Sequence, residues 1–363
     1  MKILHITKYY NELGGIETLS RNITALLKKR YKNLTVISFL RKRNRKINNK
    51  KKIKYFKEDF NIFSTPFSMG MFNYFKRNLI EFDIIHVHFP NPWVAILLFI
   101  FLKKNNKLII NWDSDIINQN FLKYFFRPIQ NYLLCKASIV ICLSKNYFKN
   151  SEDLRKFKSK VKIIPPFLNK RKILRFKTKK KITNKYKILS IGRLVKYKGF
   201  DVLIRAANLL NDNCEIIIIG DGPEKRKLIN LITKLRINSK VKIFSNIKDR
   251  QKYRIIDSSD LIVLASINRA ESFGISILEG IEAGKPGIVS DTKGSGMSDL
   301  IINGYNGYNF HNKSHNDLAK KIIKLISDKN KMKLFSKNSK KLYKKYFGSD
   351  SIKKSFLEIY ENI

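Results

Sequence analysis

Short continuous apolar segments that alternate with helical segments constrain the fold of this chain most strongly. Strands without polar alternation are buried on both faces, which is typical of parallel sheets covered by helices. The sequence therefore predicts an α/β fold built on doubly wound parallel sheets. In the first half the strands are expected at Lys2–Thr7, Leu34–Phe39, Asp83–His88, Lys107–Asn111, Ile139–Leu143 and Lys162–Ile164, and helices at Gly15–Lys29, Pro90–Lys103 and Phe121–Lys136.

The alternation stops at Pro165-Pro166 and a dense basic run, which cannot continue a core strand, and then restarts. We expect two Rossmann-like domains that face each other across a cleft: 1–168, a basic linker 169–185, then 186–345, with a C-terminal helix at 346–363 returning to the first domain. Second-half strands are expected at Lys187–Ile191, Glu215–Ile219, Val241–Phe244, Leu261–Ala265 and Gly287–Ser290, and helices at Gly199–Leu210, Pro223–Leu235, Arg250–Ser258, Phe273–Ala283 and beyond Asn316.

The composition limits the functional classes. The chain has 363 residues, 44% of them hydrophobic, so it can bury two sizeable cores. A formal net charge of +46 suits nucleic-acid binding, attraction to an anionic membrane, or a compositional drift toward Lys, Asn and Ile. The three cysteines lack a spacing motif, which favours reduced thiols in a cytosolic chain. The longest apolar run, Trp93–Leu102, is about half of a bilayer span and favours a buried helix.

A second basic run, Arg41–Lys54, interrupts the first domain. A run of like charges favours a solvated loop. The alternative is a membrane-facing patch, because Phe72–Arg77 nearby mixes aromatic and cationic side chains as interfacial helices do. Half-buried packing of Phe72–Arg77 is an equal interpretation.

Two carboxylates, Glu271 and Glu279, stand eight positions apart after the predicted strand Leu261–Ala265. A helix that starts near Phe273 rises about 1.5 Å per residue, so the carboxylates lie roughly two turns apart. One carboxylate can meet a sugar and the other the ribose of a nucleotide. Free N–H groups at the helix start would face the phosphates between them.

Three further glycine-bearing loops follow strands at the same edge of the predicted sheets. Gly14-Gly15 opens the first helix and lets backbone approach an anion, although an ordinary strand-to-helix turn has the same pattern. In Gly192–Gly199, the guanidinium fork of Arg193 and the point charge of Lys198 suit a diphosphate. Gly220–Pro223 suits a tight turn beside a flat base, and its proline suits a first helical turn or a plain turn.

These motifs resemble family 4 of the retaining glycosyltransferases, which have the two-domain GT-B fold. The resemblance covers nearly the whole chain. Its segments are Gly14–Glu17, Gly192–Gly199, Gly220–Pro223 and Glu271–Glu279. In addition, Asp83–Pro92 and Ser114–Gln119 are similar to a subgroup that builds O-antigen or capsule repeat units on a lipid carrier.

The resemblance implies a donor site without a metal ion or other cofactor. Arg193 and Lys198 would neutralise the donor diphosphate as it leaves. Glu271 would hold hydroxyls of the transferred sugar, and Glu279 those of the ribose. Transfer would retain the anomeric configuration, with the donor phosphate helping to deprotonate the acceptor. The implied donor-binding residues are Gly15, Gly192, Arg193, Lys198, Gly220, Gly222, Pro223, Glu271, Phe273, Gly274, Ile275 and Glu279.

The first domain departs from the family pattern at one position. Relatives commonly place a His where this chain has Asp113, so Asp113 joins Glu271, Arg193 and Lys198 as a catalytic candidate. Asp113-Ser114-Asp115 also matches the Asp-X-Asp pattern by which other glycosyltransferases hold a metal. His86 and His88 share a strand face but have no third ligand in sequence, and His5 suits a core, so no metal is expected. The acceptor-side candidates are His86, His88, Ser114 and Asp115.

The implied activity is transfer of a hexose from a nucleotide sugar to a lipid-linked oligosaccharide acceptor in surface-polysaccharide synthesis. The chain would act in the cytoplasm, peripherally on the anionic inner leaflet of the membrane. One alternative is a nucleotide-sugar epimerase of the same fold. A basic nucleic-acid-binding protein is the remote alternative; because the sequence has no recognition motif for it, no nucleic-acid partner is expected.

Overall fold

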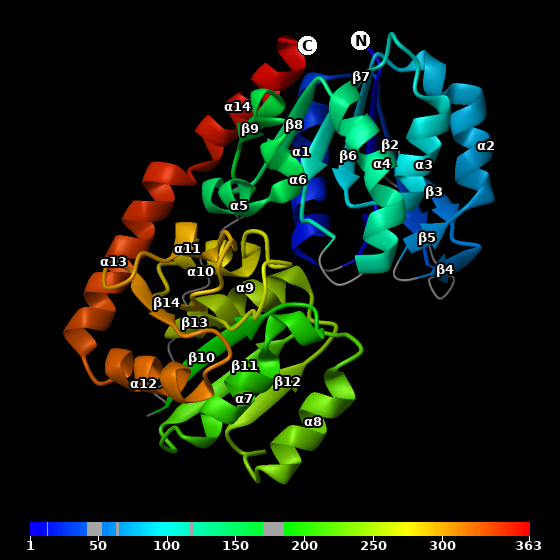
Figure 1. Ribbon diagram of the computed structural model, residues 1–363. Coiled ribbons are helices and arrows are strands. Elements are labelled where there is room, and N and C mark those ends of the chain that lie inside the picture. The colour runs from blue at the N-terminus through cyan, green and yellow to red at the C-terminus, as the bar shows by residue number, and fades with distance from the viewer. Residues whose placement is uncertain (13, 42–52, 63–64, 117–119, 170–184) are drawn as a thin grey trace. The chain divides into compact units, whose positions relative to one another are not determined.

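A computed structural model describes the chain except for residues 13, 42–52, 63–64, 117–119 and 170–184. The chain divides into two compact units, which Figure 1 colours from the N-terminus to the C-terminus. Unit 1 comprises Met1–Leu143, Ser151–Asn169 and Ser349–Ile363, and unit 2 comprises Ser144–Asn150 and Lys170–Gly348.

Unit 1 is built on a seven-stranded parallel sheet with the order β3-β2-β1-β6-β7-β8-β9. A short antiparallel pair, β4-β5, lies outside this sheet. The strands are β1 Ile3–Thr7, β2 Leu34–Leu40, β3 Ile53–Lys57, β4 Phe60–Ile62, β5 Thr65–Phe67, β6 Ile84–Phe89, β7 Lys107–Trp112, β8 Ile139–Cys142 and β9 Val161–Ile163. The helices are α1 Gly15–Arg30, α2 Met69–Asn78, α3 Pro92–Phe101, α4 Asn120–Lys136, α6 Glu152–Arg155 and α14 Ser349–Glu361.

Unit 2 is built on a six-stranded parallel sheet with the order β12-β11-β10-β13-β14-β15. Numbered within the unit, this order is 3-2-1-4-5-6, that of dinucleotide-binding folds. The strands are β10 Tyr186–Ile191, β11 Cys214–Ile219, β12 Val241–Phe244, β13 Leu261–Leu264, β14 Gly287–Ser290 and β15 Gly307–Phe310. The helices are α5 Lys145–Asn150, α7 Phe200–Asn208, α8 Lys225–Lys234, α9 Asp249–Ser258, α10 Ile275–Glu282, α11 Met297–Leu300, α12 His315–Ile326 and α13 Lys329–Tyr346.

The apolar strands of unit 2 are buried on both faces. In β11, Ile216 and Ile218 pack into a core that also contains residues of α7, α8 and α12, while Ile217 and Ile219 pack with Ile256 of α9. Successive side chains of a strand point to opposite faces, so the isoleucine run 216–219 needs a helical layer on each side. Figure 1 shows these helical layers around the sheet.

The last helix of the chain completes the core of unit 1. On α14, Ile352, Phe356, Ile359 and Tyr360 are buried. The Phe356 ring packs edge-on against Phe167, with 5.5 Å between ring centroids. The predicted fold class, two doubly wound parallel sheets with a returning C-terminal helix, is therefore confirmed.

Several local predictions need correction. The basic run was expected to be a loop through Lys54, yet Ile53–Lys57 forms the edge strand β3; residues 42–52 lie outside the described residues. The helix expected from Phe273 begins at Ile275, because Gly274 adopts a left-handed conformation (φ 93°) that ends the preceding loop. The alternation also missed the short strands β4, β5 and β15.

The apolar run Trp93–Leu102 forms α3, as expected, but is buried on one face only. Val94, Ala95, Leu97 and Leu98 are buried, whereas Phe99 is 47% and Ile100 54% exposed. Among the described residues, no helix has the length and apolarity that a bilayer crossing requires.

Candidate functional site

The carboxyl ends of three neighbouring strands form the candidate site in unit 2. In the sheet, β10 lies between β11 and β13, and all three are parallel. The loops that follow them, starting at Gly192, Gly220 and Ala265, therefore leave the sheet at the same edge. The strand order reverses between β10 and β13, and open α/β sheets bind ligands outside such a switch point.

Glycines let the backbones of these loops approach closely. A Cβ on Gly220 would lie 2.0 Å from the Gly192 carbonyl oxygen, and one on Gly222 would lie 2.4 Å from that of Leu194. Gly199 is left-handed (φ 63°), and a Cβ there would lie 2.0 Å from the Ala265 carbonyl oxygen. No other residue fits these three positions without displacing backbone, so the glycines fix the shape of the edge.

An ion pair between Lys198 and Glu271 lies at this edge. The Lys198 ammonium donates to Glu271 Oε2, and the side chains are 12% and 10% exposed. Ser266 Oγ donates to the same oxygen over 3.1 Å. Burial has the largest single effect and lowers the pKa of Lys198, but the charge of Glu271, the nearby Tyr197 and the hydrogen bond to Glu271 together outweigh it, so the pKa lies above its ordinary value. Lys198 is therefore a fixed positive charge at neutral pH.

A second ion pair holds the other glutamate. Lys252 of α9 donates to Glu279 Oε1 over 2.7 Å, and the Glu279 side chain is 4% exposed. Glu279 lies on α10. Each of the two glutamates that the sequence singles out by their spacing therefore forms an ion pair with a lysine, and the two lysines come from different elements.

The start of α10 is firmly packed. The Phe273 ring is buried and lies edge-on to Phe347, with 6.0 Å between centroids. Ser295 Oγ donates to the Glu271 carbonyl over 2.5 Å, and the Gly296 N–H donates to that of Ser272 over 3.0 Å. The first N–H groups of a helix lack partners inside it, so this rigid turn presents donors suited to an anion.

The remaining donor candidates differ in setting. The Arg193 side chain is exposed on the loop after β10. Of the two interpretations of Pro223, the plain turn is correct, because α8 begins at Lys225. In unit 1, Gly15 is the exposed first residue of α1, after Gly14 in extended conformation.

In unit 1, Asp113 follows the end of β7 and lies beside His88, near the end of the neighbouring β6, while His86 lies in the middle of β6. Asp113 is buried, accepting from His88 Nδ1 over 2.9 Å and from Asn111 Nδ2 over 2.5 Å. Asp115 is also buried and instead accepts from Trp112 Nε1 over 2.8 Å and Ser151 Oγ over 2.9 Å. Within the described part of the chain, neither aspartate joins a group of three neighbouring metal-ligating side chains. Ser114 between them is partly exposed.

Two family models match the chain. The model of glycosyl transferases group 1 matches residues 171–342, and that of glycosyltransferase family 4 matches residues 13–172. Each model therefore falls on one of the two halves of the chain, and together they leave only the ends unmatched. The chain belongs to the family 4 glycosyltransferases. This confirms the resemblance on which the site assignment rests.

Relatives of known name agree with this assignment. The transferase is 24% identical over 371 residues to O-antigen chain mannosyltransferase C of Escherichia coli, covering 100% of this chain and 99% of the relative. It is 30% identical over 254 residues to the D-rhamnosyltransferase WbpZ of Pseudomonas aeruginosa, covering 69% and 65%. The fold is similar to that of Anabaena HepE in complex with UDP and glucose, with a TM-score of 0.79, 19% identity and full coverage of both chains.

Sequence reasoning missed two residues of the candidate site. Lys252 and Ser266 contact the two predicted glutamates, yet neither lies in a recognisable motif. A lysine is an uninformative signal in a chain with 74 Lys and Arg residues. Ser266 lies two residues after β13, at the strand end where polar side chains gather. That position was the only sequence signal that could have identified it.

Proposed function

We propose that the transferase moves a hexose from a nucleoside diphosphate sugar to a lipid-linked glycan, with retention of the anomeric configuration. The observation that carries this proposal is the buried Lys198–Glu271 pair beside the glycine loops. It sets a cation and a carboxylate side by side, as the junction between a diphosphate and a sugar requires. The place in O-antigen or capsule synthesis is inferred from the E. coli and P. aeruginosa relatives.

In this proposal each charged group of the candidate site in unit 2 binds a different part of the donor. Lys198 and Arg193 neutralise the diphosphate as the glycosidic bond breaks, and the N–H groups of Phe273, Gly274 and Ile275 support it. Glu271, oriented by Ser266, binds hydroxyls of the sugar. Glu279, oriented by Lys252, binds the ribose. Because the lysine and arginine supply the positive charge, donor binding needs no divalent metal.

The proton leaves the acceptor hydroxyl for a donor phosphate oxygen, on the face where the new bond forms. No protein nucleophile is then needed. Asp113 is proposed to lie near the transferred sugar, where relatives commonly carry a His. The hydrogen bonds from His88 and Asn111 hold its carboxylate in one orientation. Of the proposed acceptor-side residues, Ser114 is partly exposed and can contact the acceptor, whereas His86, His88 and Asp115 are buried and would act from behind it, by supporting the strand ends.

A donor screen tests this proposal. Purified protein is mixed with individual nucleoside diphosphate hexoses and a lipid-linked acceptor, and release of the nucleoside diphosphate is measured. We expect one donor to be preferred, and NMR of the product to show the donor's anomeric configuration. Inversion would contradict retention. A new sugar epimer formed from the donor without acceptor would favour the epimerase instead.

We further propose that unit 1 binds the anionic inner leaflet of the cytoplasmic membrane. The exposed Phe99 and Ile100 lie next to the exposed Lys103 and Lys104. Each cation near an anionic surface contributes about 1 kcal/mol, which salt screens.

We therefore expect co-sedimentation with anionic liposomes that weakens at high salt, and a further loss in Lys103→Glu/Lys104→Glu. The matched control is Arg226→Glu/Lys234→Glu, which makes the same change of charge at exposed positions on α8 of unit 2. Equal binding to neutral liposomes, or equal losses in both variants, would contradict a specific electrostatic surface on unit 1.

A further inference from the structure

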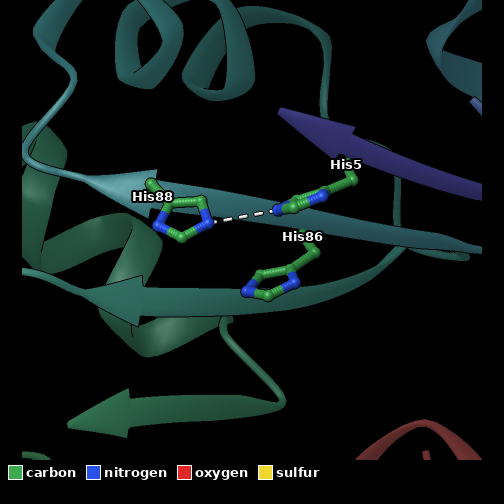
Figure 2. A group of neighbouring side chains, drawn as sticks. All are labelled: His5, His86 and His88. Atoms are coloured by element: carbon green, nitrogen blue, oxygen red, sulfur yellow. Dashed lines mark hydrogen bonds between the residues drawn. The ribbon is translucent and has the colours of Figure 1, made fainter. Parts of the chain in front are cut away.

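Three histidines of unit 1 lie together where its sheet reverses strand order (Figure 2). His5 lies on β1, and His86 and His88 lie on β6, with His5 paired to His86 in the register. All three are buried, and one ring nitrogen from each lies within 4.8 Å of those of the other two. The third ligand that the sequence did not provide beside His86 and His88 is therefore supplied by the neighbouring strand.

The Nδ1 atom of each ring is held by an oxygen from a different element. His5 Nδ1 lies 3.0 Å from Thr24 Oγ1 of α1, and His88 Nδ1 lies 2.9 Å from Asp113 Oδ2. His86 Nδ1 lies 2.5 Å from the Tyr360 hydroxyl of α14. These partners fix the orientation of all three rings. Because they engage Nδ1 in each ring, the second ring nitrogen, Nε2, is not used by them.

The Nε2 atoms are poorly matched as hydrogen-bonding groups. His5 Nε2 and His88 Nε2 lie 3.1 Å apart, so they share a single proton. His86 Nε2 is buried without a hydrogen-bond partner among the described residues. Burial lowers the pKa values of His5 and His86 well below the ordinary value, and the neighbouring histidines add to the effect. The burial that lowers these two pKa values favours neutral imidazole, which is the form that binds metals.

We propose that His5, His86 and His88 bind a divalent metal ion of the zinc class through their Nε2 atoms. Zinc–nitrogen bonds of about 2.0–2.1 Å in a tetrahedron put ligand nitrogens roughly 3.3 Å apart, close to the 3.1 Å between His5 and His88. Metal-bound histidines donate their second N–H to a carboxylate or another oxygen, the arrangement that Asp113, Thr24 and Tyr360 provide. The ion would join β1 and β6 inside unit 1, in a role separate from donor binding.

The test uses the full chain, purified without a histidine tag and stripped of metal by chelation. We expect it to bind one Zn²⁺ per chain in competition with a chromogenic chelator, and bound Co²⁺ to give the visible absorption of tetrahedral nitrogen coordination. His5→Ala and His86→Ala should lose this binding. Failure of the natural chain to bind either ion would overturn the proposal.

Matched controls separate the triad from general metal binding. His311→Ala and His315→Ala remove the other two histidines of the chain and should keep full Zn²⁺ affinity. Tyr360→Phe keeps all three ligands and removes one outer partner, so we expect affinity to fall about 10–100-fold. If a histidine variant fails to fold, Tyr360→Phe still tests the proposal, because it changes the site without removing a ligand. Equal losses in the controls, or unchanged affinity in Tyr360→Phe, would contradict the assigned coordination.

Discussion

Glu271→Gln is expected to lower kcat/KM for sugar transfer by roughly 10²–10³-fold, the usual loss for one group that stabilises transition-state charge. The amide keeps the shape of the side chain but loses the charge that pairs with Lys198. Initial rates of nucleoside diphosphate release measure the effect, and circular dichroism with a thermal melt checks that the variant is folded.

The chain offers a matched control for this substitution. Glu215 on β11 pairs with Lys242 over 2.7 Å, near the amino end of the strand and therefore at the opposite edge of the same sheet. Glu215→Gln removes a carboxylate from a similar pair and should leave kcat/KM unchanged. If Glu271→Gln retained normal turnover in a folded protein, its role in holding the sugar would be disproved.

The second large effect is expected from Lys198→Met, which removes the buried cation and keeps most of the aliphatic stem. We expect a loss of transfer of roughly 10²-fold or more, because the leaving diphosphate loses its fixed positive charge. Stability should also fall by about 3 kcal/mol, since the carboxylate of Glu271 stays buried without its partner. Lys196→Met, at an exposed position of the same loop, is the control for both measurements.

The double variant Lys198→Met/Glu271→Gln separates stability from catalysis. Removing both charges together avoids an unpaired buried charge, so its free energy of unfolding should lie closer to that of the natural chain than either single variant does. Its transfer activity should remain as low as that of the worse single variant. Additive losses of stability in a urea melt would show that the two side chains do not interact in the folded protein.

The fold could be predicted where the physical signal was local. Segments such as Ile188-Leu189 and Leu261–Leu264 are short apolar runs between helical patterns. Such runs indicate strands of a sheet that is buried on both faces. The edge strand β3, Ile53–Lys57, carries lysines and aromatics because among the described residues it has a neighbouring strand on one side only. Its sequence therefore resembles the continuation of the preceding basic run, and the strand was missed.

The site was predicted only in part because its contacts are not local. Spacing within one segment gave Glu271 and Glu279, but Lys198 meets Glu271 from a position 73 residues away. The side-chain triad likewise depends on the register between β1 and β6, which pairs His5 with His86. Sequence patterns indicate which face of the sheet a side chain occupies. Which side chain of the neighbouring strand lies beside it depends on the strand register, and the register depends on the whole sheet.

The place of α14 in unit 1 has a consequence for the order in which the protein is made. Translation proceeds from the N-terminus, and domains commonly fold in that order. Here the buried side chains of Ile352, Phe356 and Tyr360 follow the described strands of unit 2 in sequence. The strands of unit 2 are all complete before those residues leave the ribosome. Unit 1 therefore keeps an open apolar surface until the described strands of unit 2 have been synthesised.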